Sequence, residues 1–173
     1  MKALSADIGL QLSWTQPSAL ERYFELYSDN ILLEKLSIEP GWTATGELTI
    51  PALATERWTL KSNGILKKAR MTIRDAGTDE ILAVYFPKFW GGGRVEFVNG
   101  RSFSWESISF WATGRGFFNE RQERIFVLNR KQLDLLKVQS TVKIEAPYRD
   151  LPELPILLML ACYLSVQNSY ANR

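Results

Sequence analysis

An almost wholly apolar run near the carboxyl end, residues 154–166, constrains this chain more than any other feature. At about 100° per residue, a helix over this run has no polar face, so it needs apolar surroundings on every side. A bilayer span needs about 20 apolar residues, and a run of about 10–14 is more typical of a buried helix. We therefore expect a central helix over about residues 151–167, enclosed by the rest of the chain.

Residues at the two ends of this run suggest where the helix begins and ends. Asp150 is the expected N-cap, with Glu153 three positions later, as in a capping box. Pro155 lacks a backbone amide, so a start near Pro155 is the alternative. Asn168 is the expected left-handed cap at the far end.

Upstream of this run, the chain repeats short segments rich in β-branched and aromatic residues. Gly, Asn, Asp and Pro separate them at intervals of roughly 8–12 residues, which is typical of an antiparallel sandwich or barrel. Within 57–61, for example, Trp58 and Leu60 alternate with polar neighbours, as in a half-buried strand. The expected strands are 10–14, 22–27, 31–38, 43–50, 57–61, 69–74, 80–86, 94–98, 102–105, 109–113, 124–128, 133–138 and 141–145.

The connections between these segments carry tight-turn residues, such as Asn63-Gly64 and Asn99-Gly100. Such turns join neighbouring antiparallel strands, so we expect an up-and-down meander. An open sheet of this size would leave unpaired edges, whereas a barrel of about twelve strands removes them and needs a filling. The sequence therefore predicts a mainly β chain with a single domain over residues 1–173, a closed antiparallel barrel around the apolar helix.

The residue types that are missing exclude several kinds of site. The chain has no histidine and a single cysteine, Cys162, which we interpret as core. It therefore has no Ser-His-Asp arrangement, no imidazole ligand and no structural zinc site. We expect no cofactor, no metal and, with no disulfide framework or visible signal peptide, a cytoplasmic setting. Glu120 and Glu123 could act as a catalytic carboxylate pair if they met in a cleft, but the sequence does not show that they do. An enzyme is therefore the least supported interpretation.

Several segments follow one another in a serial-hairpin order. They are Trp58-Thr-Leu-Lys-Ser-Asn-Gly64, Thr72-Ile-Arg-Asp75, Ile81-Leu-Ala83, Gly91-Gly-Gly-Arg-Val95 and Gly100-Arg-Ser-Phe-Ser-Trp105. This order resembles the tubby C-terminal-like superfamily, which includes the LURP-one-related proteins and the phospholipid scramblases. The resemblance covers almost the whole chain. It implies a barrel that is threaded by an apolar helix. It also implies that the protein associates with phosphoinositides or other membrane lipids.

Basic residues gather between Glu56 and Asp75, where six of them against these two acids give +4 in a chain whose total is +2. The six are Arg57, Lys61, Lys67, Lys68, Arg70 and Arg74. Strand alternation places the first two and the last two on one outer surface, with the remaining lysines at its rim. Such a surface suits anionic headgroups, to which each basic residue contributes about 1 kcal/mol. A solvated outer face is the alternative.

Two further stretches are weaker candidates. In the run Gly91, Gly92, Gly93 and Arg94, successive amides can turn toward one anion. A barrel corner also needs glycine, and we favour the corner. Aromatics between residues 103 and 118 lie near Arg115, Arg121 and Arg124 and could stack nucleobases. They more often fill a barrel wall, so we expect no nucleic-acid partner.

The preferred hypothesis is a non-enzymatic binding or scaffold domain, peripheral to a membrane, that reads anionic phospholipid headgroups such as phosphoinositides on its outer basic patch. One alternative is a hollow barrel of the lipocalin type that carries a small hydrophobic ligand. Another is a tail-anchored protein in which residues 151–166 span a bilayer. The short run, Glu153 and two prolines argue against the tail anchor. The sequence does not indicate an oligomeric state.

Overall fold

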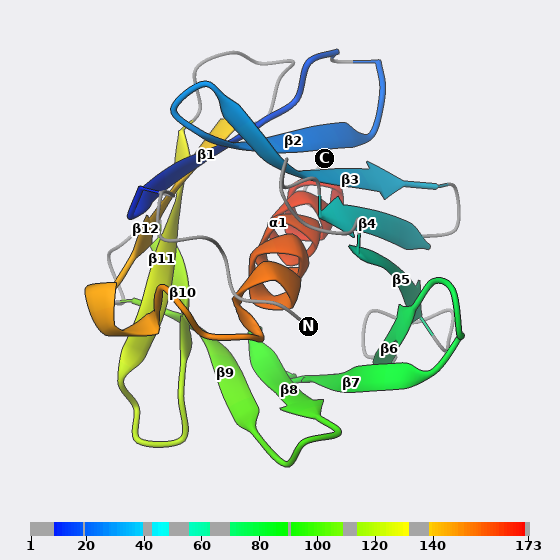
Figure 1. Ribbon diagram of the computed structural model, residues 1–173, viewed down its shortest axis with the longest axis vertical. Helices are drawn as coiled ribbons and strands as arrows, with labels where there is room; N and C mark the ends of the chain where they lie inside the picture. Colours follow the sequence, from blue (N-terminus) through cyan, green and yellow to red (C-terminus); the bar gives the residue numbers. More distant parts are fainter. Residues whose placement is uncertain are drawn as a thin grey trace.

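A computed structural model describes residues 9–18, 20–39, 43–48, 56–62, 70–89, 91–108, 114–131 and 139–171. Within these residues, twelve strands form one closed antiparallel barrel, and β1 (Gln11–Thr15) pairs with β12 (Gln139–Ile144) to close it. The helix α1 (Leu154–Ala171) lies in the middle of the ring (Figure 1). The predicted fold class, a closed antiparallel barrel around a carboxyl-terminal apolar helix, is confirmed.

The strands follow one another around the barrel in chain order. Between β1 and β12 they are β2 (Tyr23–Ser28), β3 (Ile31–Ile38), β4 (Ala44–Leu48), β5 (Glu56–Ser62), β6 (Met71–Asp75), β7 (Ile81–Pro87), β8 (Gly93–Phe97), β9 (Ser102–Ser107), β10 (Gly114–Phe118) and β11 (Arg124–Lys131). A short 3₁₀ helix, η1 (Ala146–Tyr148), leads toward α1. The strands predicted at 109–113 and 133–138 lie outside the described residues. β10 was not predicted, because Gly114 and Gly116 weaken its strand pattern.

The helix α1 fills the lumen of the barrel. Every residue from 154 to 164 is buried, so the helix is enclosed on all sides, as its lack of a polar face requires. At Gly46 in β4 an added Cβ would overlap the Sδ atom of Met159, so the helix packs directly against the backbone there. The largest buried side chains of the wall include Trp14, Trp58, Trp105, Phe117 and Phe126. Among the described residues, the helix occupies the part of the lumen that a lipocalin-type barrel leaves for its ligand, so the hollow-barrel alternative is wrong.

The bounds of α1 differ from the predicted helix over residues 151–167. The amide of Leu157 donates to the carbonyl oxygen of Glu153 at 3.0 Å, and Pro155 occupies the first turn, where helices need no amide. Asp150 therefore lies in the turn before the helix instead of capping it. Asn168 lies within the helix and has no left-handed backbone, so the predicted stop was wrong. Polar residues there mark the end of the enclosed part of the helix, not the end of the helix.

The N-terminal end of α1 is fixed by an ion pair between a buried carboxylate and a partly exposed arginine. Glu153 has only 1% of its side chain exposed, and it accepts hydrogen bonds from Asn99 Nδ2 at 2.7 Å and Arg101 NH1 at 3.1 Å. Both partners belong to the turn between β8 and β9. This contact attaches the start of the helix to the barrel wall. Within the described residues, no helix has the length and apolar character needed to cross a membrane.

Candidate functional site: an arginine-lined barrel mouth

The described residues of the predicted basic patch lie on the outer surface of the barrel. Lys61 is opposite Thr72 and Thr59 is opposite Arg74, so the basic residues of β5 and β6 share the outer face, as predicted. Arg57 lies on the same strand face as Lys61, and Arg70 lies just before β6 with its guanidinium 5.1 Å from the centroid of the Phe86 ring. Lys67 and Lys68 lie outside the described residues.

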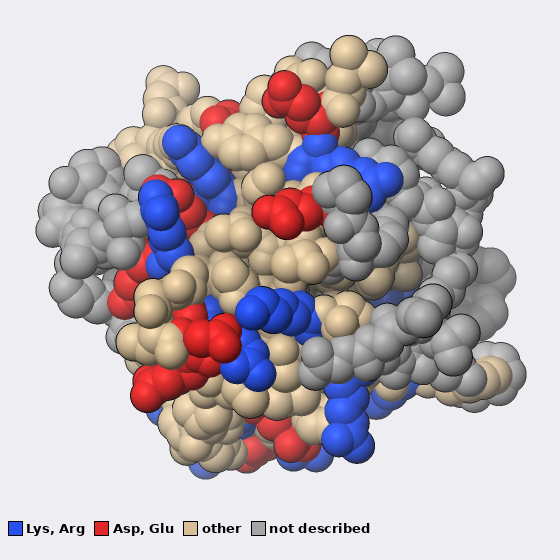
Figure 2. Space-filling model, turned by 90° about the vertical axis from the view of Figure 1, so that its right-hand side faces the viewer, with Lys and Arg blue, Asp and Glu red and all other residues tan. Residues whose placement is uncertain are grey.

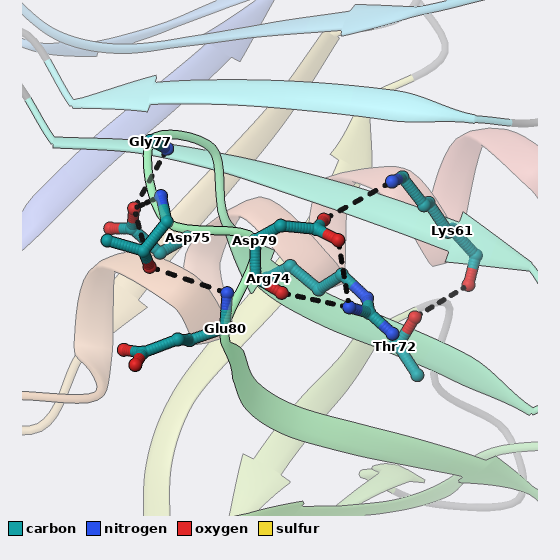
Figure 3. A network of polar contacts seen from close by, with 8 residues as sticks. Lys61, Thr72, Arg74, Asp75, Gly77, Asp79 and Glu80 are labelled. Carbon is teal, nitrogen blue, oxygen red and sulfur yellow. Dashed lines mark hydrogen bonds and ion pairs between the residues drawn. The ribbon is translucent and has the colours of Figure 1, made fainter.

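Two carboxylates pair with three of the four patch residues that the structure describes. Asp79 pairs with Lys61 Nζ at 3.3 Å and with Arg74 NH1 at 3.2 Å, as Figure 3 shows. Arg57 Nε lies 3.3 Å from a carboxylate oxygen of Glu47. Exposed pairs of this kind contribute little stability, typically about 0–1 kcal/mol, but they lower the local positive charge.

The turn that presents Asp79 is built from the predicted turn sequence. The Asp75 carboxylate accepts hydrogen bonds from the amides of Gly77 at 2.8 Å and Thr78 at 2.9 Å. These amides, that of Thr78 most, hold the pKa of Asp75 below its ordinary value. Asp79 itself has a left-handed backbone, with φ of 58°. The turn therefore places an acid beside the patch by local hydrogen bonding.

Opposite charges also alternate from strand to strand on this side of the barrel. Register places Glu25 opposite Lys35, Lys35 opposite Glu47, and Glu47 opposite Arg57. Such cross-strand pairs contribute roughly 0.2–1 kcal/mol each. Figure 2 shows acidic and basic side chains interleaved on this face. Headgroup binding at the outer patch stays a prediction, and the structure shows a surface whose charges largely compensate one another.

The glycine run is divided between two places. Gly91 and Gly92, with φ of 92° and 74°, form the turn between β7 and β8, where the Gly91 amide donates to the Lys88 carbonyl oxygen at 3.4 Å. Gly93 is a buried strand residue packed against Tyr85. Arg94 points outward, pairs with Glu96 at 3.3 Å and donates to Ser102 Oγ at 3.0 Å. The structure therefore does not bring these residues together around one anion.

Two arginines instead point inward at the end of the barrel where α1 ends. In β11, Arg130 continues the inner face of Phe126 and Leu128, and it pairs by register with the buried Ser140. In β10, Arg115 shares the inner face of Phe117 and lies opposite Leu128. Arg115 and Arg130 are therefore diagonal neighbours, a relation that separates Cβ atoms by roughly 7–8 Å. We call this end of the barrel, around Arg115 and Arg130, the arginine mouth.

The arginine mouth contains two adjoining hollows. The first has a volume of about 100 Å³ and the second a volume of about 140 Å³, and they share Trp105, Arg115 and Asn168. The first hollow is also lined by Ser62, Met71, Tyr85, Pro87, Lys88, Gly91, Gly92, Leu164 and Gln167, and the second by Leu128, Arg130 and Ser165. A water takes roughly 30 Å³ of liquid volume, so each hollow admits a group of a few heavy atoms.

Among the described residues, the positive charge of the arginine mouth has no carboxylate partner. No acidic residue belongs to the described lining of either hollow. Lys88 is paired with Glu106 at 3.1 Å, but no carboxylate of the described residues pairs with Arg115 or Arg130. The carboxyl end of α1 contributes about half a negative charge. Because two guanidinium charges exceed this, the described part of the mouth has a net positive charge.

The local backbone and Trp105 complete the site. An added Cβ on Gly91 would lie 3.2 Å from Arg115 NH2, and one on Gly92 would overlap the carbonyl oxygen of Trp105. The glycines thus let the turn approach both residues. Trp105 is 1% exposed, and its Nε1–H is buried without an acceptor among the described residues. Burial raises the pKa of Tyr85, which keeps that lining hydroxyl neutral, although Arg115 opposes the shift.

A separate unpaired group lies inside the barrel. Glu34 of β3 is fully buried, and both of its carboxylate oxygens lack a hydrogen-bond partner among the described residues. Burial raises the pKa of Glu34 well above its ordinary value, and burial together with Glu34 raises the pKa of the Cys162 thiol. Burial therefore favours the protonated, neutral form of Glu34. Strand alternation places Glu34 on the same face as Leu36 and Ile38, so its inward direction could have been predicted from the sequence.

The remaining sequence candidates have structural partners. Phe103, Trp105 and Phe117 are buried in the wall, as predicted, whereas Phe110 and Trp111 lie outside the described residues. Glu120 accepts a hydrogen bond from Ser102 Oγ at 2.8 Å, and Glu123 accepts one from Tyr148 at 2.5 Å. Among the described residues, no group of three or more potential metal ligands comes together.

Sequence reasoning named Arg115 only beside the aromatic series and did not single out Arg130. The alternation of Phe126 and Leu128 with their neighbours, continued to Arg130, is the signal that could have found Arg130, whereas Arg115 has no such signal. No protein-family model, curated protein or solved structure matches the chain. The resemblance to the tubby C-terminal-like superfamily therefore stays a prediction, while the barrel and its central helix are observed.

Proposed function

We propose that this chain is a non-enzymatic binding domain that takes an anionic group at the arginine mouth. The observation that carries the proposal is the pair of inward-facing arginines, Arg115 and Arg130, in a lining without an acidic residue among the described positions. A planar guanidinium binds the oxygens of phosphate or carboxylate with two parallel hydrogen bonds. Phosphate is the anion that we expect.

Calorimetric titration with inorganic phosphate at constant ionic strength tests this proposal. We expect Arg115→Gln to weaken phosphate binding roughly tenfold or more, because a charged hydrogen bond contributes about 1.5–3 kcal/mol. Arg57→Gln is the matched control, since Arg57 lies on the outer face and is paired with Glu47. Equal phosphate affinity in the wild type and in Arg115→Gln, or no binding at all, would overturn the proposal.

A purely structural role of Arg115 predicts a different result. In that case the guanidinium stabilises the carboxyl end of α1, where cations are favourable by about 0.3–1 kcal/mol. Arg115→Gln would then lower the free energy of unfolding in the absence of phosphate and leave phosphate affinity unchanged. Chemical denaturation of both proteins, with and without phosphate, separates the two roles.

Phosphate can be free or part of a phospholipid headgroup, and both sources present the same chemistry to the arginine mouth. Flotation with neutral and with phosphoinositide-containing vesicles distinguishes them. Binding of the anionic vesicles that is lost in Arg115→Gln would assign a headgroup to the mouth. Phosphate binding without vesicle binding would assign a soluble ligand.

The outer basic patch is a second candidate for the same headgroups. Arg70 is the residue that favours it, because it is exposed and no carboxylate of the described residues pairs with it. If vesicle binding is lost in Arg70→Gln and kept in Arg115→Gln, the outer patch is the lipid-binding surface. The compensated charges of Arg57, Lys61 and Arg74 make this the weaker of the two sites.

A further inference from the structure

We infer that the ligand of the arginine mouth carries two phosphate groups, one in each hollow, with Arg115 between them. This inference rests on the proposed function and specifies the ligand class of the same site. It follows from the shape of the mouth and from the positions of its cations.

The shape of the mouth favours two groups over one. The hollows of about 100 Å³ and about 140 Å³ are separate spaces, yet Arg115, Trp105 and Asn168 line both of them. A guanidinium carries five N–H donors in a planar fork, so it can donate to oxygens on two sides. Arg115 is therefore placed to contact a phosphate in either hollow at the same time.

The positions of the two arginines also favour a second phosphate group. A single anion in the first hollow is placed to pair with Arg115, but Arg130 lines only the second hollow and would stay without a carboxylate among the described residues. A half-buried cation without a counter-charge costs free energy, and two such cations on diagonal neighbours also repel each other. A second phosphate beside Arg130 removes both costs.

Calorimetric titration with inorganic pyrophosphate and with inorganic phosphate, at equal ionic strength, tests the inference. We expect the wild type to bind pyrophosphate at least tenfold more tightly than phosphate. Arg130→Gln should weaken pyrophosphate binding more than phosphate binding, so that the preference for pyrophosphate over phosphate falls to less than about threefold, because the second phosphate loses its guanidinium. Arg115→Gln should weaken both ligands, and Arg57→Gln neither.

A further variant keeps the test independent of folding. Arg130→Lys retains the charge and loses the planar guanidinium, so it should bind pyrophosphate with an affinity between those of the wild type and Arg130→Gln.

The outcomes separate the two proposals. Equal affinities for the two ligands, or an Arg130→Gln variant that binds pyrophosphate like the wild type, would overturn the inference and leave Arg115-dependent phosphate binding in place. Absence of binding for both ligands would overturn the proposed function together with it.

Discussion

The two ends of the barrel differ in whether their inward-facing charged side chains have partners of opposite charge among the described residues. At the start of α1, the enclosed carboxylate of Glu153 is paired with Asn99 and Arg101. At the other end, Arg115 and Arg130 face the hollows with no carboxylate among the described residues. A buried charge with partners fixes the geometry around it, whereas one without partners costs free energy until something completes it. The first arrangement is therefore a structural attachment, and the second is the site at which we propose that an anion binds.

The largest expected effect comes from breaking the paired end. Arg101→Ala leaves Glu153 buried with Asn99 as its remaining partner, so we expect the free energy of unfolding to fall by about 2–3 kcal/mol. Urea denaturation at neutral pH measures this. Arg121→Ala, which removes an exposed arginine from the turn between β10 and β11, is the control and should change it by less than about 0.5 kcal/mol. Equal effects of the two variants would mean that the ion pair does not fix the helix.

Glu34 adds a third case to the comparison between the two ends of the barrel. It is an ionisable group that is fully buried inside the barrel and has no hydrogen-bond partner among the described residues. Glu34→Leu should raise the free energy of unfolding by about 1–3 kcal/mol, since the cost of burying an unsatisfied polar group disappears. Glu34→Gln should gain less, because its amide still lacks a partner. Urea denaturation at neutral pH compares the three proteins. A loss of stability in Glu34→Leu would show that the carboxyl group has a stabilising contact.

The pH dependence of stability follows from the same residue. The folded-state pKa of Glu34 is raised well above its ordinary value of 4.5, so the folded chain binds more protons than the unfolded chain between these two pKa values. The free energy of unfolding should therefore fall as pH rises above the ordinary value, until the folded-state pKa is passed. Denaturation from about pH 5 to about pH 8, below the range of cysteine, measures the slope. Glu34→Gln should flatten this slope, and an unchanged slope would assign the titration to another group.

The smallest effect is expected at the unpaired end. Without phosphate, the double variant Arg115→Gln, Arg130→Gln should change the free energy of unfolding by less than about 0.5 kcal/mol, and upward, because two like charges no longer repel. The gain should shrink in high sodium chloride, which screens the charges. Thermal unfolding at low and high salt provides the measurement. A loss of stability comparable to that of Arg101→Ala would make the arginines structural.

The fold could be predicted because its signals are local and repeated. Alternation such as that of Trp58 and Leu60 indicates a half-buried strand wherever it occurs, and turn sequences such as Asn99-Gly100 join neighbours. The missing strand, β10, has glycine at two of its positions and carries no such pattern. The helix was placed correctly, and only its bounds were displaced, because capping residues are weaker signals than an apolar run.

The candidate site could be predicted only in part. The basic patch was placed on the correct face, but its partners Glu47 and Asp79 come from another strand and from a turn, so only register brings them to Arg57 and Lys61. The inward direction of Arg115 was hidden because its flanking residues are both glycine. Which residues lie opposite one another depends on how all the strands pair in the closed barrel. A short stretch of sequence does not contain this information.

By itself, the sequence determined that this chain must enclose its own carboxyl-terminal helix, because a helix without a polar face has to be surrounded by apolar side chains. It also determined the antiparallel meander, since short alternating segments and tight turns leave few other arrangements. Only the tertiary structure decided which charges meet: Glu153 with Arg101 at one end, and Arg115 beside Arg130 at the other. Electrostatic interactions depend on distance and burial in space, and these are set when the barrel closes around the helix.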